Sequence, residues 1–381
     1  MKRGLTRLGW VLISRGKRGW RGQKAILVLE DGTVFEGVGF GRPGLVTGEV
    51  VFTTGMVGYP EALTDPSYRG QILCFTYPLI GNYGVPSYED VDEFGIPLHF
   101  ESTQIQVRGV VVHELCWEPY HWASRRGLND WLEEEGVPGI AGIDTRALTK
   151  RLREAGVMMG ALQVAEEVSL EECLEALKHA PRYDEVDYVR ETTVKEPVEH
   201  RGPGPRVVVI DCGIKAGILR ALLSRGFSVV RLPYTASADE VLSYEPRGVL
   251  ISNGPGNPVR CRDAIEAARE VFEAGLPLFG ICLGNQIISL ALGGSTYKLK
   301  YGHRGQNKPC IDLDTGLCYV TSQNHGYAVD PNSLKGTGLR VWFLNADDKT
   351  VEGIRHESRP CLAVQFHPEA RPGPYDTEWI F

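Results

Sequence analysis

The segment Phe279-Gly280-Ile281-Cys282-Leu283-Gly284-Asn285-Gln286 joins the end of an apolar run to the start of a helical pattern. One glycine stands two residues before Cys282, and another stands two residues after it. This spacing is typical of a nucleophile elbow, a sharp strand-to-helix turn that exposes a reactive side chain. The glycines are needed because a Cβ atom at either position would collide with the neighbouring strand or helix. The segment therefore predicts that Cys282 is a nucleophile at the end of a strand.

The chain around this turn alternates between strands and helices. Short connections between such elements predict a mostly parallel sheet covered by helices on both faces, which is an α/β fold. Ligands of these sheets bind at the carboxyl ends of the strands, where Cys282 falls. Strand patterns occupy 206–210, 227–232, 248–252 and 278–281, and helical patterns occupy 214–224, 262–274 and 283–292.

The first half of the chain has a different pattern. An apolar run from Ala25 followed by Asp31-Gly32 predicts a β-hairpin, and further short β-prone runs continue to Val112. Helical patterns follow at 130–135, where Asn129 is the expected N-cap, and at 144–154. We therefore expect a mixed β/α domain over 25–181, a polar linker rich in Pro and Gly over 182–205, and the α/β domain over 206–381.

Composition excludes several classes of protein. A chain of 381 residues exceeds one usual core, which agrees with two domains. No apolar run approaches the ~18 residues of a membrane span, and a net charge of −7 argues against a nucleic-acid partner. The nine cysteines are irregularly spaced, so free thiols in the cytoplasm are expected. We expect no metal site, because Cys310 and Cys318 are too far apart for a zinc half-site.

Residues 1–24 form a basic extension without an acidic residue. An acid-free basic start can be a targeting arm. This one has no clean apolar face and no cleavage signal, so we interpret it as a disordered extension or a start codon placed too early. Its basic residues are Lys2, Arg3, Arg7, Arg15, Lys17, Arg18, Arg21 and Lys24.

A cysteine nucleophile needs a base that holds and later delivers a proton. His367 follows a β run in Gln365-Phe366-His367-Pro368-Glu369. Glu369 is two residues further on and can accept a hydrogen bond from the second imidazole nitrogen. We therefore expect a triad of Cys282, His367 and Glu369. His325 is the alternative base, ranked lower because no carboxylate stands at the right offset.

A third motif, Ser252-Asn253-Gly254-Pro255-Gly256-Asn257-Pro258, follows another strand. Gly and Pro in this arrangement turn backbone N–H groups outward, which suits a second donor wall for an oxyanion beside Cys282. An ordinary connecting turn is the alternative for this motif. For Cys282 the alternative is a small buried apolar side chain, which most cysteines are.

Together the three motifs resemble the class I, triad-type glutamine amidotransferases. The first half narrows the resemblance to the small-subunit family of carbamoyl-phosphate synthases. The stretches that carry it are Gly58-Tyr59-Pro60-Glu61-Ala62-Leu63-Thr64-Asp65-Pro66-Ser67-Tyr68, Thr76-Tyr77-Pro78-Leu79-Ile80-Gly81-Asn82-Tyr83-Gly84 and Gly142-Ile143-Asp144-Thr145-Arg146-Ala147-Leu148-Thr149. The chain departs from the family at Asn285, where His is usual, and at Tyr327, where Phe is more common.

This resemblance implies a glutamine-hydrolysing subunit that releases ammonia through a γ-glutamyl thioester. It implies a large-subunit partner that makes carbamoyl phosphate from bicarbonate, and that partner would bind ATP and Mg. No cofactor is expected in this chain. The implied contacts with L-glutamine and its oxyanion are Ser67, Gly254, Gly256, Leu283, Gln286, Asn324, Gly326 and Tyr327.

Three alternatives stay open at this point. The chain could serve another ammonia-using synthase, act alone as a γ-glutamyl cysteine hydrolase, or be a docking protein with an idle triad. The stretch at 65–68 speaks against the first alternative, and the intact triad speaks against the last.

Overall fold

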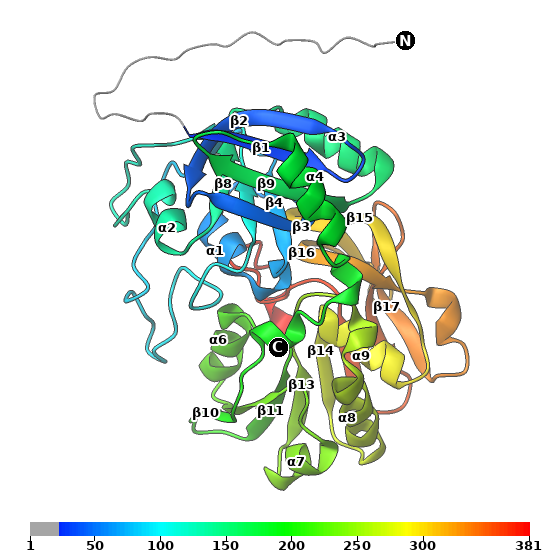
Figure 1. Cartoon of the computed structure of the whole chain (residues 1–381). Helices are drawn as coiled ribbons and strands as arrows, with labels where there is room; N and C mark the ends of the chain where they lie inside the picture. The colour runs from blue at the N-terminus through cyan, green and yellow to red at the C-terminus, as the bar shows by residue number, and fades with distance from the viewer. Residues whose placement is uncertain (1–22) are drawn as a thin grey trace.

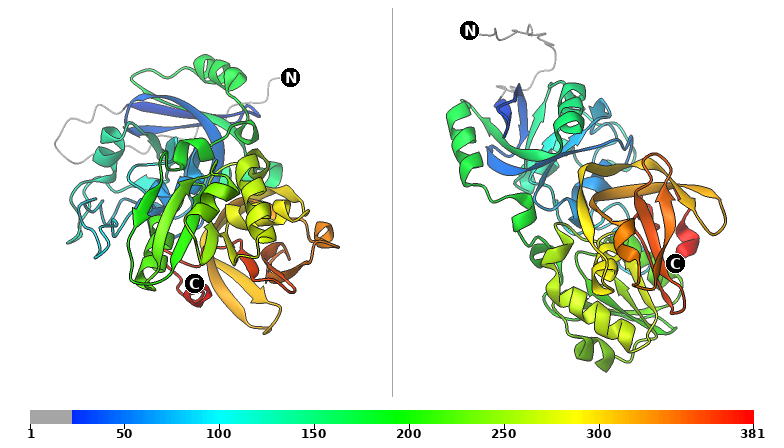
Figure 2. Two further views of the ribbon diagram at one scale, coloured as in Figure 1. Left: turned by 90° about the horizontal axis from the view of Figure 1, so that it is seen from below. Right: turned by 90° about the vertical axis from the view of Figure 1, so that its right-hand side faces the viewer.

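The computed structural model describes residues 23–381, so residues 1–22 of the expected extension 1–24 lie outside the described part. The expected boundary is wrong at its end, because Lys24 is the first residue of strand β1. The described chain folds around a closed barrel and a ten-stranded sheet (Figure 1), and Figure 2 shows the same two bodies from two further directions. No helix within residues 23–381 combines the length and the apolar character that crossing a membrane requires.

The barrel occupies the first half of the chain, with strand order β1-β2-β8-β6-β4-β3-β9. Leu29 N donates to Thr33 O across the expected Asp31-Gly32 turn, so the predicted hairpin is present. A small β5–β7 pair lies outside it. The strands are β1 (Lys24–Leu29), β2 (Val34–Gly41), β3 (Gly44–Thr53), β4 (Gln71–Phe75), β5 (Leu79–Ile80), β6 (Gly109–Val111), β7 (Glu114–Leu115), β8 (Pro138–Ala141) and β9 (Met158–Ala165).

The barrel's helices agree with the expected positions, but one cap differs. Helix α2 begins after Gly127 rather than after Asn129, because the Asn129 side chain is buried and accepts from Gly41 N at 2.9 Å. Leu148 and Leu152 of α3 pack against a core cluster with residues from barrel strands. The short elements of this half are α1 (Tyr59–Thr64), η1 (Pro66–Tyr68), α2 (Leu128–Glu134), α3 (Thr145–Ala155), α4 (Leu170–His179), η2 (Tyr183–Glu185) and α5 (Val189–Thr192).

The second sheet runs in the order β10-β12-β11-β13-β14-β19-β18-β16-β15-β17. The expected parallel arrangement holds for five adjacent strands, from β12 to β19. The strands beyond β19 are antiparallel, because short turns join them in sequence. The strands are β10 (Val198–His200), β11 (Arg206–Asp211), β12 (Ser228–Pro233), β13 (Gly248–Ile251), β14 (Leu278–Ile281), β15 (Thr296–Asp312), β16 (Cys318–Val329), β17 (Leu339–Asn345), β18 (Val351–His356) and β19 (Cys361–Val364).

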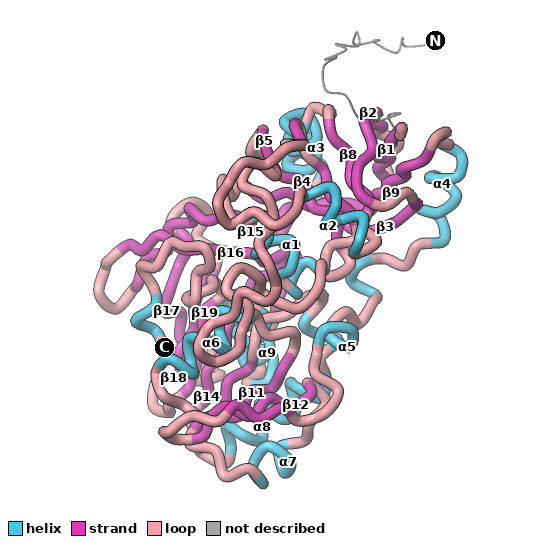
Figure 3. Tube along the Cα trace, turned by 90° about the vertical axis from the view of Figure 1, so that its left-hand side faces the viewer, coloured by secondary structure: helices cyan, strands magenta, loops and turns pink. Residues whose placement is uncertain are grey.

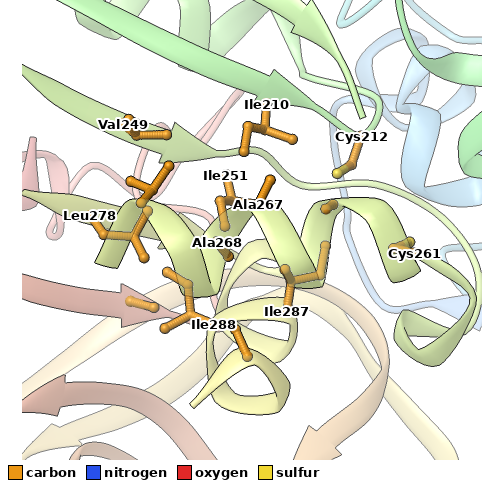
Figure 4. Packing of buried hydrophobic residues seen from close by; sticks show 14 of the residues in the cluster. Ile210, Cys212, Val249, Ile251, Cys261, Ala267, Ala268, Leu278, Ile287 and Ile288 are labelled. Carbon is orange, nitrogen blue, oxygen red and sulfur yellow. The ribbon is translucent and has the colours of Figure 1, made fainter. Parts of the chain in front are cut away.

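Helices cover both faces of the parallel strands. Ile210 and Ile251 point to the cluster formed with α7, α8 and α9 (Figure 4), whereas Val209 and Leu250 point to the cluster formed with α6. This alternation buries both faces of each strand, as a doubly covered sheet requires. The helices and remaining turns are α6 (Ala216–Ser224), α7 (Ala238–Ser243), η3 (Pro258–Arg260), α8 (Arg262–Glu273), α9 (Leu283–Ala291), η4 (Pro331–Leu334) and η5 (Glu378–Ile380).

The long β15–β16 hairpin joins the second sheet to the barrel. Lys298 Nζ of β15 donates to Glu49 Oε1 of β3 at 2.7 Å, and Lys300 O accepts from Val157 N at 2.9 Å. Figure 3 shows β15 and β16 on the barrel side of the second sheet. The barrel therefore lies next to the carboxyl ends of the parallel strands, where Ser67 of the barrel half contacts Asn253 after β13.

The two elbow glycines let α9 approach the sheet. A Cβ on Gly284 would lie 2.1 Å from Ile251 O, and one on Gly280 would lie 2.6 Å from Gly284 O. Both distances are far below van der Waals contact, so only glycine fits without a backbone shift.

Replacing Gly284 by Ala should lower the free energy of unfolding by about 2 kcal/mol, the usual scale of an overpacked core. Alanine would otherwise favour a helix by about 1 kcal/mol, so the sign of the change identifies the clash. Urea unfolding of the full chain measures it. Gly44→Ala is the control, because nothing lies within 4 Å of its added Cβ. Equal stability of both variants would contradict this packing argument.

Candidate active site

Cys282 lies between β14 and α9 with a strained backbone. Its φ of 55° and ψ of −102° place a non-glycine residue in a region that costs about 1–3 kcal/mol. Cys282 N donates to Val364 O of β19 at 2.8 Å, which anchors the turn to the neighbouring strand. The strain directs the thiol out of the strand, as a nucleophile elbow requires.

His367 and Glu369 follow β19, which is the strand next to β14. His367 Nδ1 lies 2.7 Å from Glu369 Oε1, and both side chains are buried. His367 Nε2 has no hydrogen-bond partner within the described chain, and the Cys282 thiol is among the groups that act on the imidazole. The Cys282 thiol itself donates to Asn324 O at 3.7 Å. The three expected triad residues therefore lie near one another.

The charge of Glu369 controls the imidazole. Burial alone would lower the pKa of His367, but the Glu369 carboxylate and the Cys282 thiol outweigh burial and raise it to about 10. Burial would likewise raise the pKa of Glu369, but Lys215 and His367 lower it to about 2. The pair is therefore held as an imidazolium and a carboxylate.

Lys215 is a residue of this site that sequence reasoning missed. Its Nζ donates to Glu369 Oε1 at 2.8 Å, so Lys215 and His367 share one carboxylate oxygen. Lys215 is 4% exposed, and the nearby carboxylates raise its pKa although burial opposes them. The one sequence signal was a lysine a few residues after the buried strand β11.

A cavity opens beside Cys282, and the empty space there, open solvent included, is about 430 Å³. Every residue that the resemblance implied for glutamine lines it, together with Cys282. These are Ser67, Gly254, Gly256, Leu283, Gln286, Asn324, Gly326 and Tyr327. A second cavity of about 400 Å³ is lined by His367 and Lys215, and Asn324 borders both cavities.

The barrel half contributes one wall of the first cavity. Ser67 of η1 accepts a hydrogen bond from Asn253 Nδ2 at 3.0 Å. Asp65 Oδ2 accepts from Asn324 Nδ2 of β16, also at 3.0 Å. The site is therefore built from both halves of the chain.

Gln286 and Tyr327 are joined on the opposite wall. Gln286 Nε2 donates to Tyr327 O and to Gln365 Oε1, each at 3.1 Å. Asn285 Nδ2 donates to the same Gln365 oxygen and is fully buried, so its side chain serves packing behind the cavity.

Comparisons with known proteins agree with this arrangement. The family model "Carbamoyl-phosphate synthase small chain, CPSase domain" matches residues 27–162, and "Glutamine amidotransferase class-I" matches residues 208–381. The carbamoyl phosphate synthase small chain of Sulfolobus acidocaldarius is 53% identical over 93% of this chain and 94% of its own length. The carbamoyl phosphate synthase small chain of Pyrococcus furiosus is 52% identical over 94% of this chain and 96% of its own length. The chain belongs to the carbamoyl phosphate synthase small chain family.

Membership confirms the family resemblance that the three motifs and the first half predicted. It also identifies the second half as a class I glutamine amidotransferase fold.

The alternative base, His325, faces other groups. Its Nδ1 lies 2.9 Å from Tyr327 O, and its Nε2 lies 3.3 Å from Gln323 Oε1 and 3.7 Å from Glu352 Oε1. Both ring nitrogens are thus engaged within β16 and with β18. His325 lines the first cavity without occupying the place of a base.

A buried cluster lies behind His325. His303, His325 and Glu352 have ligand-type atoms within 4.8 Å of one another, an arrangement that could hold a metal ion. However, both His303 nitrogens face carboxylates, Glu352 at 3.1 Å and Asp348 at 2.9 Å. A ring that donates from both nitrogens is an imidazolium and not a metal ligand. The ion pairs of His303 with Glu352 and Asp348 therefore account for this arrangement, whereas burial lowers the pKa of His325.

The cluster predicts a pH-dependent contribution to stability. Burial would raise the pKa of Glu352, but His325 and His303 lower it to about 2, while the pKa of His303 is raised above 6.5 by Glu352 and Asp348 against burial. The Glu352 contribution is present above its unfolded pKa of ~4.3 and is lost as the pH falls towards 2. The His303 contribution is present below pH 6.5 and is lost as the pH rises through its folded pKa.

Glu352→Gln should therefore lower the free energy of unfolding by about 2 kcal/mol near pH 6, because it removes one of the two carboxylates that face the buried His303 imidazolium. The difference should shrink as the pH falls to about 3. Urea unfolding at a series of pH values measures both effects. The exposed Glu357→Gln is the matched control, and equal stability of the two variants at pH 6 would refute the ion pair.

Proposed function

We propose that this chain is the glutamine-hydrolysing subunit of a carbamoyl-phosphate synthase, with Cys282, His367 and Glu369 as its catalytic residues. The observation that carries the proposal is the buried His367–Glu369 pair beside the strained Cys282, at the ends of two adjacent parallel strands. Such a group combines a nucleophile, a proton carrier and an orienting carboxylate.

The reaction follows from these roles. The Cys282 thiolate attacks the side-chain amide carbon of glutamine, and the C–N bond breaks as His367 gives its proton to the leaving nitrogen. Ammonia departs and a γ-glutamyl thioester remains on Cys282. His367 then takes a proton from a water molecule, the water oxygen attacks the thioester carbon, and the C–S bond breaks to release glutamate.

Two backbone N–H groups would stabilise the oxyanion, those of Leu283 and Gly254. Leu283 opens α9, where free N–H groups and the helix dipole favour negative charge. Gly254 approaches so closely that a Cβ would lie 2.9 Å from Leu283 Cδ2 and 2.2 Å from Cys212 O. Glycine at this position thus brings the two donor segments together.

The remaining cavity residues would hold the rest of the glutamine molecule. Ser67, Gln286 and Asn324 offer polar groups, while Gly256 and Gly326 leave room for backbone contacts. The hydroxyl of Tyr327 has no hydrogen-bond partner in the described chain although it is buried, so it is available to a ligand.

A large subunit would consume the ammonia, with bicarbonate and ATP, and would bind the ATP and Mg. Ammonia would leave the thioester on the His367 side, where the second cavity lies. We assign docking of this partner to residues 25–181 and glutamine hydrolysis to the domain over 206–381. The segment 182–205 joins them, and its strand β10 pairs with β12 of the second sheet. The exposed Tyr120 and Trp122 are consistent with a covered surface there. All nine cysteines are free, which supports a cytoplasmic location.

Cys282→Ala should abolish glutamine-dependent synthesis of carbamoyl phosphate, with a loss of at least ~10³-fold, while ammonia-dependent synthesis by the complex is retained. The measurement uses the full chain in complex with its large subunit, with glutamine or ammonium chloride as the nitrogen source. Cys318→Ala is the control, because that cysteine is exposed and outside the cavity.

Retained glutamine-dependent synthesis by Cys282→Ala would refute the proposal. Glutaminase activity that is insensitive to the large subunit would point instead to a stand-alone hydrolase. Ammonia transfer without carbamoyl phosphate would indicate another synthase.

A further inference from the structure

Glu101 lies in the barrel half of the chain but caps a helix of the other half. Its backbone oxygen accepts from Ala216 N at 2.9 Å, and its side-chain Oε2 accepts from Gly217 N at 2.8 Å. Helix α6 begins at these two residues, and its own N-cap residue, Lys215, makes no side-chain cap. Glu101 therefore satisfies the helix N-terminus that the local sequence leaves open.

The second carboxylate oxygen of Glu101 faces the triad. Glu101 Oε1 lies 3.6 Å from Lys215 Nζ, and it has no hydrogen-bond partner in the described chain although it is buried. Lys215 donates in turn to Glu369, the carboxylate that orients His367. The contacts thus run from the barrel half to the proposed base through one ammonium group.

Gly217 makes this convergence possible. A Cβ at position 217 would lie 3.0 Å from Glu369 Cγ and 3.3 Å from Glu101 Oε1. Both carboxylate side chains therefore pack against the same glycine, on either side of Lys215. Any longer side chain there would separate them.

Donors face both carboxylate oxygens of Glu101, although its pKa is raised. Burial raises the pKa most, and Glu369 and Asp65 add to this, whereas the Lys215 ammonium and the Gly217 amide at the positive end of α6 lower it. A proton on either oxygen would point at a donor. The other charged groups that act on this cluster are Asp65, Glu61 and Arg371.

We propose that Glu101 is a positioning residue of the glutaminase, which holds Lys215 between two carboxylates and so sets how His367 and Cys282 share their proton. The inference rests on the proposed function. The barrel half would then contribute to catalysis in two ways, by forming one wall of the cavity and by positioning Lys215.

The direction of the effect follows from the charges. Lys215 opposes the protonation of His367, because it draws on the same Glu369 oxygen. Glu101 offsets part of the Lys215 charge. Without the Glu101 charge, the Lys215 ammonium is paired with Glu369 alone and neutralises more of its charge. The imidazolium of His367 is then stabilised less and loses its proton at lower pH.

Glu101→Gln is the test, because it keeps the size and the polar character of the side chain but removes its charge. The pH dependence of glutaminase kcat/KM is measured for the full chain in complex with its large subunit. We expect the alkaline limb to move to lower pH by about one unit, so that kcat/KM falls about tenfold on that limb while KM changes little. An alkaline limb at the wild-type pH would overturn the inference.

Two further variants separate positioning from folding. Glu101→Asp keeps the charge but moves it away from Lys215, so a smaller shift in the same direction is expected. If Glu101→Gln does not fold, Glu101→Asp is the test instead. A wild-type pH profile for Glu101→Asp would then overturn the inference. Asp92→Asn is the matched control: Asp92 joins the same two halves through Arg220 at 2.6 Å without contacting Lys215, so its profile should be that of the wild type.

Failure of the proposed function has a different signature. In that case the wild-type chain and Cys282→Ala hydrolyse glutamine equally, before any Glu101 variant is compared. An active wild type with an unchanged Glu101→Gln profile refutes the positioning role alone.

Discussion

The positive φ of Cys282 is the constraint from which the site is built. The turn is possible because glycines 280 and 284 let β14 and α9 meet without side chains between them. It is useful because β14 lies between β13 and β19 in the sheet, so that their following loops flank the thiol. The Gly254 segment then lies on one side and His367 on the other, and three motifs far apart in sequence become neighbours. A rearrangement of strand order would separate them even if every motif were intact.

The charges around His367 are better explained by chemistry than by stability. A buried ion network costs desolvation that its attractions barely offset, so it is weak support for a fold. Here one oxygen of Glu369 receives both Lys215 and His367, and Glu101 restrains Lys215 from the far side. Such an arrangement makes the proton affinity of the imidazole depend on the position of several groups.

The sequence predicted best what is local or depends on strand ends. The strands 206–210 and 278–281, and the positions of Cys282 and His367 at strand ends, could be predicted because glycine spacing and apolar runs are local signals. The antiparallel strands β15–β18 could not, because polar residues interrupt their apolar pattern. Lys215 and Glu101 were missed because their meaning arises from contacts between distant segments. Asn129 was misread as a cap, since its side chain bonds the barrel strand β2 instead.

The β15–β16 hairpin has a consequence for how the chain denatures. Its Lys298 and Lys300 are tied to the barrel, while its strands are part of the other sheet. If either the barrel or the second sheet unfolded alone, the other would lose the contacts that β15 makes between them. The two should therefore unfold in a single cooperative transition, with equal calorimetric and van't Hoff enthalpies.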